Sequence, residues 1–243
     1  MTCRLCSQDL TIELDVEDFD EATSSSVGVS QKTPDDLLLK ACNCHFHWQC
    51  LLDESASVAI DFKCPSCHAS IISGSAPSVR VLTIYINEGG IQDDLDIHPL
   101  IVEEAYLYAN PAARPARAFM TMCAEGDVAG ILELVKAIEE DRDSEDMSPA
   151  QLLRYQDPLD GGMTGLHVAV EKSQQEVFWL LLCLASNIPI DAFPHEVVQL
   201  AQSMGAARYP GSEGDIREIR DQQGRTAADI TSSMGLNWTG LLS

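Results

Sequence analysis

Seven cysteines and one histidine within the first 67 residues form a series whose spacing is typical of zinc ligands. Cys-x2-Cys pairs begin and end the series, and a Cys-x-Cys-x2-His-x2-Cys run lies between them. Thiolate and neutral imidazole suit tetrahedral Zn²⁺, and eight of them complete two four-coordinate sites. Because no position is left for a reacting water, we expect two structural Zn²⁺ ions and no catalytic metal. The ligands would be Cys3, Cys6, Cys42, Cys44, His47, Cys50, Cys64 and Cys67.

Two alternatives bear on this series. A disulfide framework would need an oxidising compartment, but the chain shows no signal-peptide pattern, so we expect an intracellular protein, cytoplasmic or nuclear. His45 competes with Cys44 for one ligand position. If His45 were the ligand, only Phe46 would separate it from His47, and this spacing favours Cys44.

The ligand order resembles the RING finger family of ubiquitin ligases. The segments that carry this resemblance most clearly are Cys42-Asn43-Cys44-His45-Phe46-His47-Trp48-Gln49-Cys50 and Cys64-Pro65-Ser66-Cys67. Many RING fingers have histidine where Cys44 stands, so the chain would be a variant. The resemblance implies a small cross-brace α+β zinc domain over residues 1–72. In it, Cys3, Cys6, His47 and Cys50 would hold one zinc, and Cys42, Cys44, Cys64 and Cys67 the other.

RING ligases hold a ubiquitin-conjugating enzyme in a shallow groove and supply no catalytic nucleophile. Leu5, Leu51 and Pro65 stand where the family places groove contacts, although each could instead serve knuckle packing or turn geometry. His68 follows the eighth ligand, where an arginine that clasps ubiquitin often stands. A histidine lacks the permanently charged guanidinium fork. Acidic residues at 53 and 54 also occupy the region where many active members have tryptophan.

These departures keep two other functions open. One is a non-catalytic scaffold whose RING-like fold only organises an interface. The other is a histone-tail reader of the PHD class, which shares the order of seven cysteines and one histidine and has an aromatic residue like Phe62 before its seventh ligand. That class separates its fourth and fifth ligands by more residues than the two between Cys44 and His47.

Charge restricts the possible partners. The chain has 38 acidic residues against 15 Lys and Arg, a formal net charge of −23. Such a field repels phosphate backbones, so we expect no nucleic-acid partner and expect a protein substrate that is basic if it is charged. No apolar run is long enough to cross a membrane, so we expect no membrane partner.

The acidic segment 11–35 reads as a disordered insertion between the first two ligand pairs, because it is too polar to bury a core. We expect residues 73–113 to form a linker that contains a strand or hairpin, with a strand over Val79–Ile86 and a turn at Asn87–Gly90, and a helix over Pro99–Ala109.

A second resemblance lies in the C-terminal half. Gly162-Met163-Thr164-Gly165-Leu166-His167-Val168-Ala169-Val170, followed by Glu176-Val177-Phe178-Trp179-Leu180-Leu181-Leu182, resembles the ankyrin repeat. Thr164 can cap the first helix, small Ala169 permits close helix approach, and His167 would belong to the turn network. Gly165 replaces the customary proline and Ser173 the customary mid-repeat glycine.

Two flanking segments, 124–135 and 221–230, extend this resemblance. Their offsets exceed the period of about 33 residues, so insertions must separate the repeats, and one contains a helix over His195–Met204. We expect an all-α stack of about three irregular repeats over residues 114–243, with Cys123 and Cys183 in its core. Together the two resemblances imply a RING ubiquitin ligase that binds a ubiquitin-loaded conjugating enzyme through the zinc domain and its substrate through ankyrin repeats.

Overall fold

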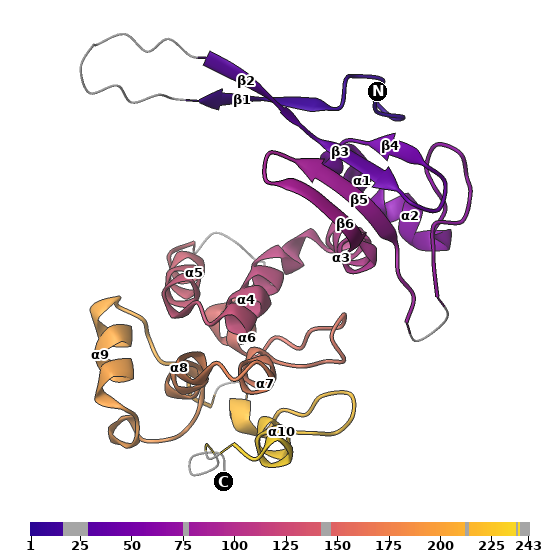
Figure 1. The fold of residues 1–243 in the computed structure, drawn as a ribbon. Coiled ribbons are helices and arrows are strands. Elements are labelled where there is room, and N and C mark those ends of the chain that lie inside the picture. Colours follow the sequence, from indigo (N-terminus) through magenta and orange to yellow (C-terminus); the bar gives the residue numbers. More distant parts are fainter. Residues whose placement is uncertain (17–28, 75–77, 142–146, 212–213, 237, 239–243) are drawn as a thin grey trace, which may run out of the picture. The chain divides into compact units, whose positions relative to one another are not determined.

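The computed structural model describes residues 1–16, 29–74, 78–141, 147–211, 214–236 and 238 (Figure 1). Within these ranges the chain divides into two compact units, Met1–Asn110 and Pro111–Ser243. We refer to them as the N-terminal unit and the C-terminal unit. The first contains small antiparallel sheets and the Cys/His series, and the second is helical.

A four-stranded antiparallel sheet in the order β4-β3-β5-β6 forms the centre of the N-terminal unit. The strands are β3 (Asp36–Leu39), β4 (Cys44–Phe46), β5 (Leu82–Asn87) and β6 (Gly90–Asp96). Buried and half-buried residues alternate along β3, as expected when one face of a strand meets a core.

The described residues of this unit also form three helices, α1 (Trp48–Asp53), α2 (Ser55–Asp61) and α3 (His98–Ala109). α3 packs against both α1 and α2. The core includes Phe46, Leu51 and Ile101. The strands and helix expected within a 73–113 linker therefore contribute to the sheet and the core, because β5 pairs with β3 across a long stretch of sequence. Residues 75–77 lie outside the described part.

The described ends of the 11–35 segment also differ from the expected disorder. They form an antiparallel hairpin of β1 (Thr11–Val16) and β2 (Val29–Pro34), and residues 17–28 lie outside the description. Main-chain groups supply the hydrogen bonds of the ladder, and Lys32 on β2 lies 3.8 Å from the carboxylate of Glu13 directly opposite on β1, so a polar segment can pair in this way.

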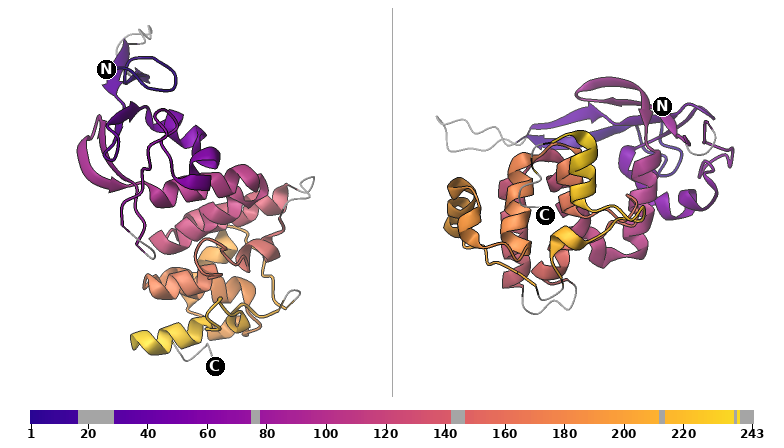
Figure 2. Two further views of the ribbon diagram at one scale, coloured as in Figure 1. Left: turned by 90° about the vertical axis from the view of Figure 1, so that its right-hand side faces the viewer. Right: turned by 90° about the horizontal axis from the view of Figure 1, so that it is seen from below.

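The C-terminal unit consists of helices that pack in two rows around a continuous apolar core. α4, α7 and α10 follow one another in the first row, while α5, α8 and α9 form the second (Figures 1 and 2). The helices are α4 (Arg114–Glu125), α5 (Val128–Glu140), α6 (Pro149–Leu153), α7 (Gly165–Glu171), α8 (Gln175–Ala185), α9 (His195–Ser203) and α10 (Ala227–Met234). Short 3₁₀ turns occur at Pro111–Ala113, Ile190–Ala192 and Ile216–Glu218.

Tight turns join the paired helices of this unit. Gly126, between α4 and α5, has φ +84°, and Ser173, between α7 and α8, has φ +59°. The left-handed conformation costs glycine little and other residues more, so Ser173 holds a strained position where the ankyrin pattern has glycine.

A buried arginine fastens the long connection between α8 and α10. Arg154 donates hydrogen bonds to the carbonyl oxygens of Ala150, Ala185, Tyr209 and Gly214 at 2.8–3.2 Å. The bonds to Tyr209 and Gly214 satisfy main-chain acceptors of this connection, and those to Ala150 and Ala185 tie it to α6 and α8.

Candidate metal centres

The eight predicted ligands gather into two groups of four. Within each group the potential ligand atoms all lie within 4.8 Å of one another. The first group is Cys3, Cys6, His47 and Cys50, and the second is Cys42, Cys44, Cys64 and Cys67. Pairs one and three thus meet, as do pairs two and four, and the chain interleaves the two groups. This arrangement is compatible with a zinc finger.

Distances within the first group fit a tetrahedral ion. Nδ1 of His47 lies 3.3 Å from Sγ of Cys6 and 3.7 Å from Sγ of Cys50. Tetrahedral Zn²⁺ with ordinary Zn–S and Zn–N bonds would separate sulfur from nitrogen by about 3.6 Å. The donor set and its spacing therefore fit Zn²⁺.

The orientation of His47 supports this geometry. Its Nε2 lies 2.8 Å from the carbonyl oxygen of Asp9, which can only accept a hydrogen bond. Nε2 therefore carries the proton, and the lone pair of Nδ1 faces the sulfurs. Metal-bound histidines commonly have such an outer partner, which fixes both tautomer and ring orientation. A backbone carbonyl leaves no side-chain signal, so the sequence could not reveal Asp9.

His45 is excluded from both groups by its own contact. Its Nδ1 lies 2.7 Å from Oδ1 of Asp36 on the neighbouring strand β3. Alternation along β4 buries Cys44 and Phe46 and turns His45 to the other face of the strand. The competing assignment of His45 as a ligand in place of Cys44 therefore has no support in the structure.

The first and last Cys-x2-Cys pairs share one turn geometry. The backbone N–H of Ser7 donates to the carbonyl of Cys3 at 3.0 Å, and that of His68 donates to Cys64 at 2.9 Å. Ser7 and His68 both have positive φ, at +63° and +60°. The same local turn thus presents two sulfurs to each group.

Electrostatics within the groups favour a bound cation. Burial raises the pKa of Cys3, but N–H groups of Cys6, Leu5 and His47 outweigh it and bring this pKa down to about 6. An N–H from Ala69 lowers the pKa of Cys67 to about 7. Burial and neighbouring sulfurs raise the pKa of Cys44 to about 11 and that of Cys50 to about 12. One thiolate therefore forms readily in each group, and the positive charge of an ion is what would favour the others.

The four expected conjugating-enzyme contacts have different exposures. Leu5 and Pro65 are half-buried and His68 is exposed. Leu51 has no exposed surface, because α1 turns it into the core. Its assignment to a contact surface is therefore a correction: Leu51 is a core residue. A depression of about 610 Å³ borders the first group, but none of the four lines it.

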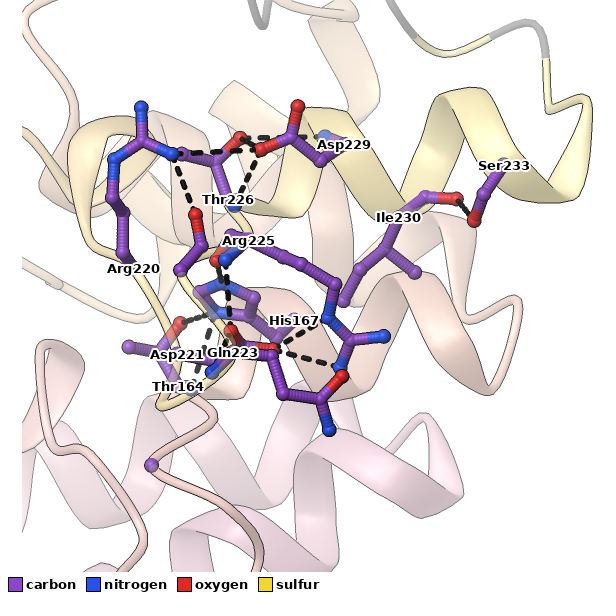
Figure 3. Close-up of polar contacts among 12 residues, drawn as sticks. Thr164, His167, Arg220, Asp221, Gln223, Arg225, Thr226, Asp229, Ile230 and Ser233 are labelled. Carbon is purple, nitrogen blue, oxygen red and sulfur yellow. Dashed lines mark hydrogen bonds and ion pairs between the residues drawn. The ribbon is translucent and has the colours of Figure 1, made fainter.

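A buried hydrogen-bond network joins two turns of the C-terminal unit (Figure 3). His167 Nδ1 accepts from the backbone N–H of Thr164 at 3.2 Å and lies 2.7 Å from its hydroxyl oxygen. His167 Nε2 lies 3.0 Å from the carbonyl of Arg225, to which it donates. Burial lowers the pKa of His167, so the ring stays neutral. This histidine has the structural role expected of it and no catalytic geometry.

The second turn repeats the cap of the first. Thr226 accepts from the N–H of Asp229 at 3.3 Å, while an Asp229 carboxylate oxygen accepts from the Thr226 N–H at 2.8 Å. Asp221 accepts from Arg225, and the N–H of Gln222 donates to the carbonyl of Gly161 at 2.8 Å. The two turns are therefore linked edge to edge as well as through His167.

Searches of protein-family models, of curated proteins and of solved structures found no match to this chain. Among the described residues, no helix combines the length and apolar character needed to span a bilayer.

Proposed function

We propose that the protein is a RING-type ubiquitin ligase with two structural zinc ions. The observation that carries the proposal is the interleaving of the two Cys/His groups. Two independent knuckles would each hold one ion with neighbouring ligands. An interleaved pair would instead fix the first Cys-x2-Cys turn, α1 and the last Cys-x2-Cys turn relative to one another.

This arrangement explains how a domain without a nucleophile could accelerate transfer. We propose that the two groups hold Leu5, between the ligands Cys3 and Cys6, and Pro65, between the ligands Cys64 and Cys67, on one frame. Both are half-buried, so each keeps surface for a conjugating enzyme. Zinc, when bound, would hold this frame in place. The protein would accelerate transfer by orienting the ubiquitin-loaded enzyme towards a substrate lysine.

The helical unit is proposed to be an irregular ankyrin stack that recruits substrate. Its support is the repeated helix pair with left-handed turns at Gly126 and Ser173, together with the histidine link from one turn to the next. Repeat stacks bind partners through extended surfaces, which suits a recruiting module. We propose an intracellular location, in the cytoplasm or nucleus, where a conjugating enzyme is available.

The test is reconstituted ubiquitin transfer. The full chain, mixed with ubiquitin, activating enzyme and a panel of conjugating enzymes, should form polyubiquitin chains. Leu5→Ala or Pro65→Ala should reduce chain formation without loss of structure. Ile91→Ala is the matched control, because Ile91 is an exposed apolar residue of the same unit outside the knuckles.

A non-catalytic scaffold is the second candidate. Two observations favour it: His68 stands where ligases often have arginine, and Leu51 is unavailable for contact. Absence of chains across the whole panel, with both metals bound, would select the scaffold.

A further inference from the structure

A groove of about 440 Å³ lies on the second row of helices in the C-terminal unit. It runs between the start of α5, the first half of α8 and α9. α9 belongs to the connection between α8 and α10, so this groove is formed by an insertion and differs from a surface made by regular repeats. Its lining residues are Val128, Gln175, Glu176, Trp179, Leu180, Pro194, Glu196, Val197 and Leu200.

The floor of the groove is apolar. Trp179 is half-buried against Phe178, with ring centroids 4.9 Å apart, and Leu200 keeps 39% of its surface exposed. α9 is fixed beside this floor because Ala201 and Phe193 belong to the core. A well-packed apolar floor that contains a tryptophan is the kind of surface on which interface energy concentrates.

The rim of the groove is acidic. Glu176 in α8 and Glu196 in α9 are both exposed, and no lysine or arginine is among the described residues that line the groove. Both glutamates also lie in first helical turns, where they stabilise their helices. Helix stability does not require that the two glutamates line the same groove, so their position at one rim needs a separate explanation.

This pattern selects among occupants. Small-molecule pockets orient their ligands with a few inward polar groups, whereas the polar lining groups here, Gln175, Glu176 and Glu196, are exposed. An apolar centre with a charged rim is the anatomy of a protein interface. The net charge of −23 further favours a basic partner. We propose that the groove binds a protein segment that carries aliphatic side chains between lysine or arginine residues.

The aliphatic side chains would pack on Trp179 and Leu200, and the basic ones would pair with Glu176 and Glu196. In the proposed ligase, which this inference deepens, such a segment would be the recognition element of the substrate. Binding itself requires no ubiquitin transfer, so it can be measured separately.

The direct experiment uses the full chain and short fluorescent peptides. The first peptide has a central pair of leucines flanked by lysines. In the second, glutamates replace the lysines, and in the third, serines replace the leucines. Fluorescence anisotropy should show saturable binding of the first peptide only, and the binding should weaken as salt is raised.

Two variants place the binding in the groove. Leu200→Ala should weaken binding about tenfold by removing an apolar contact, and Glu176→Lys with Glu196→Lys should weaken it by at least about tenfold. The control is Glu133→Lys with Glu171→Lys, which makes the same charge change at exposed residues outside the groove. Circular dichroism checks that each variant is folded. If the double charge reversal unfolds the unit, the binding of Leu200→Ala alone tests whether the peptide occupies the groove.

Any of these results would overturn the proposal: no saturable binding of the first peptide, equal binding of the glutamate or serine peptide, unchanged binding in Leu200→Ala, or equal loss in the control variant. Failure of ubiquitin transfer with peptide binding intact would refute the ligase and leave the groove assignment standing.

Discussion

Gly165→Ala tests the packing of α4 on α7, on which the helical stack depends. A Cβ added at Gly165 would lie 2.7 Å from Phe119 Cε1, 2.8 Å from Phe119 Cζ and 2.8 Å from Cys123 Sγ. Ordinary carbon contacts are about 3.5–4.0 Å, so neighbours must move by about 0.7 Å or more. Phe119 and Cys123 are both fully buried, which leaves them little room to move.

The expected cost follows from two opposing effects. Overpacking of this kind costs about 1–3 kcal/mol. Alanine has less conformational freedom than glycine in the unfolded chain, and this difference stabilises the folded state by about 0.4–1 kcal/mol. We therefore expect Gly165→Ala to lower the free energy of unfolding by about 1–2 kcal/mol. Proline has the same Cβ, which explains why the customary residue of the ankyrin pattern does not fit beside Phe119.

The assay is urea unfolding in a Trp48→Phe background. Trp48 is the only one of the three tryptophans in the N-terminal unit, so fluorescence then reports on Trp179 and Trp238 in the C-terminal unit. Phe119→Leu removes both ring atoms that would clash, and in that background the alanine penalty should fall by about 1 kcal/mol, as expected for residues in contact. An unchanged penalty in the two backgrounds, or a stabilising Gly165→Ala, would refute this packing.

Two further predictions concern the same unit. Arg154→Met should lower the free energy of unfolding by about 2–4 kcal/mol, because it leaves several carbonyl oxygens without donors. Arg114 is exposed, so Arg114→Met should change this free energy little, and equal effects of the two substitutions in urea unfolding would contradict the role of Arg154. Burial lowers the pKa of His167 below its ordinary value of 6.5, so below pH 6.5 the unfolded chain binds the proton more readily. Stability of the C-terminal unit should therefore fall as pH falls from 6.5, and His167→Gln should flatten this slope in the same fluorescence assay.

The two metal groups were the most predictable part of this molecule. A Cys-x2-Cys pair is a local turn, and its geometry recurs at Cys3 and Cys64 with the same backbone hydrogen bond. The resemblance to RING fingers then predicted which pairs meet, and the structure brings those pairs together. The helix pair around Ser173 was predicted from a resemblance to the ankyrin repeat, supported by a cap at Thr164, which is a short-range signal.

Features that depend on pairing across long stretches of sequence were missed. β5 pairs with β3, which lies far away in the sequence, and no local pattern indicates this pairing. The segment that contains β5 was therefore predicted to be part of a linker. The β1–β2 hairpin was hidden by its acidic composition. The burial of Leu51 depends on where α1 begins and which face it turns inward, and spacing from Cys50 does not specify that. The groove on α9 likewise arises from the packing of an insertion.

Metal content tests the central claim most directly. All eight ligands lie in the N-terminal unit, in two groups that share no residue. Native mass spectrometry of the full chain should therefore show two Zn²⁺ ions, and Cys6→Ser should lower the occupancy of the first group while the second keeps its ion. A chain with fewer than two ions, or one whose ligand cysteines form disulfides instead, would contradict the account.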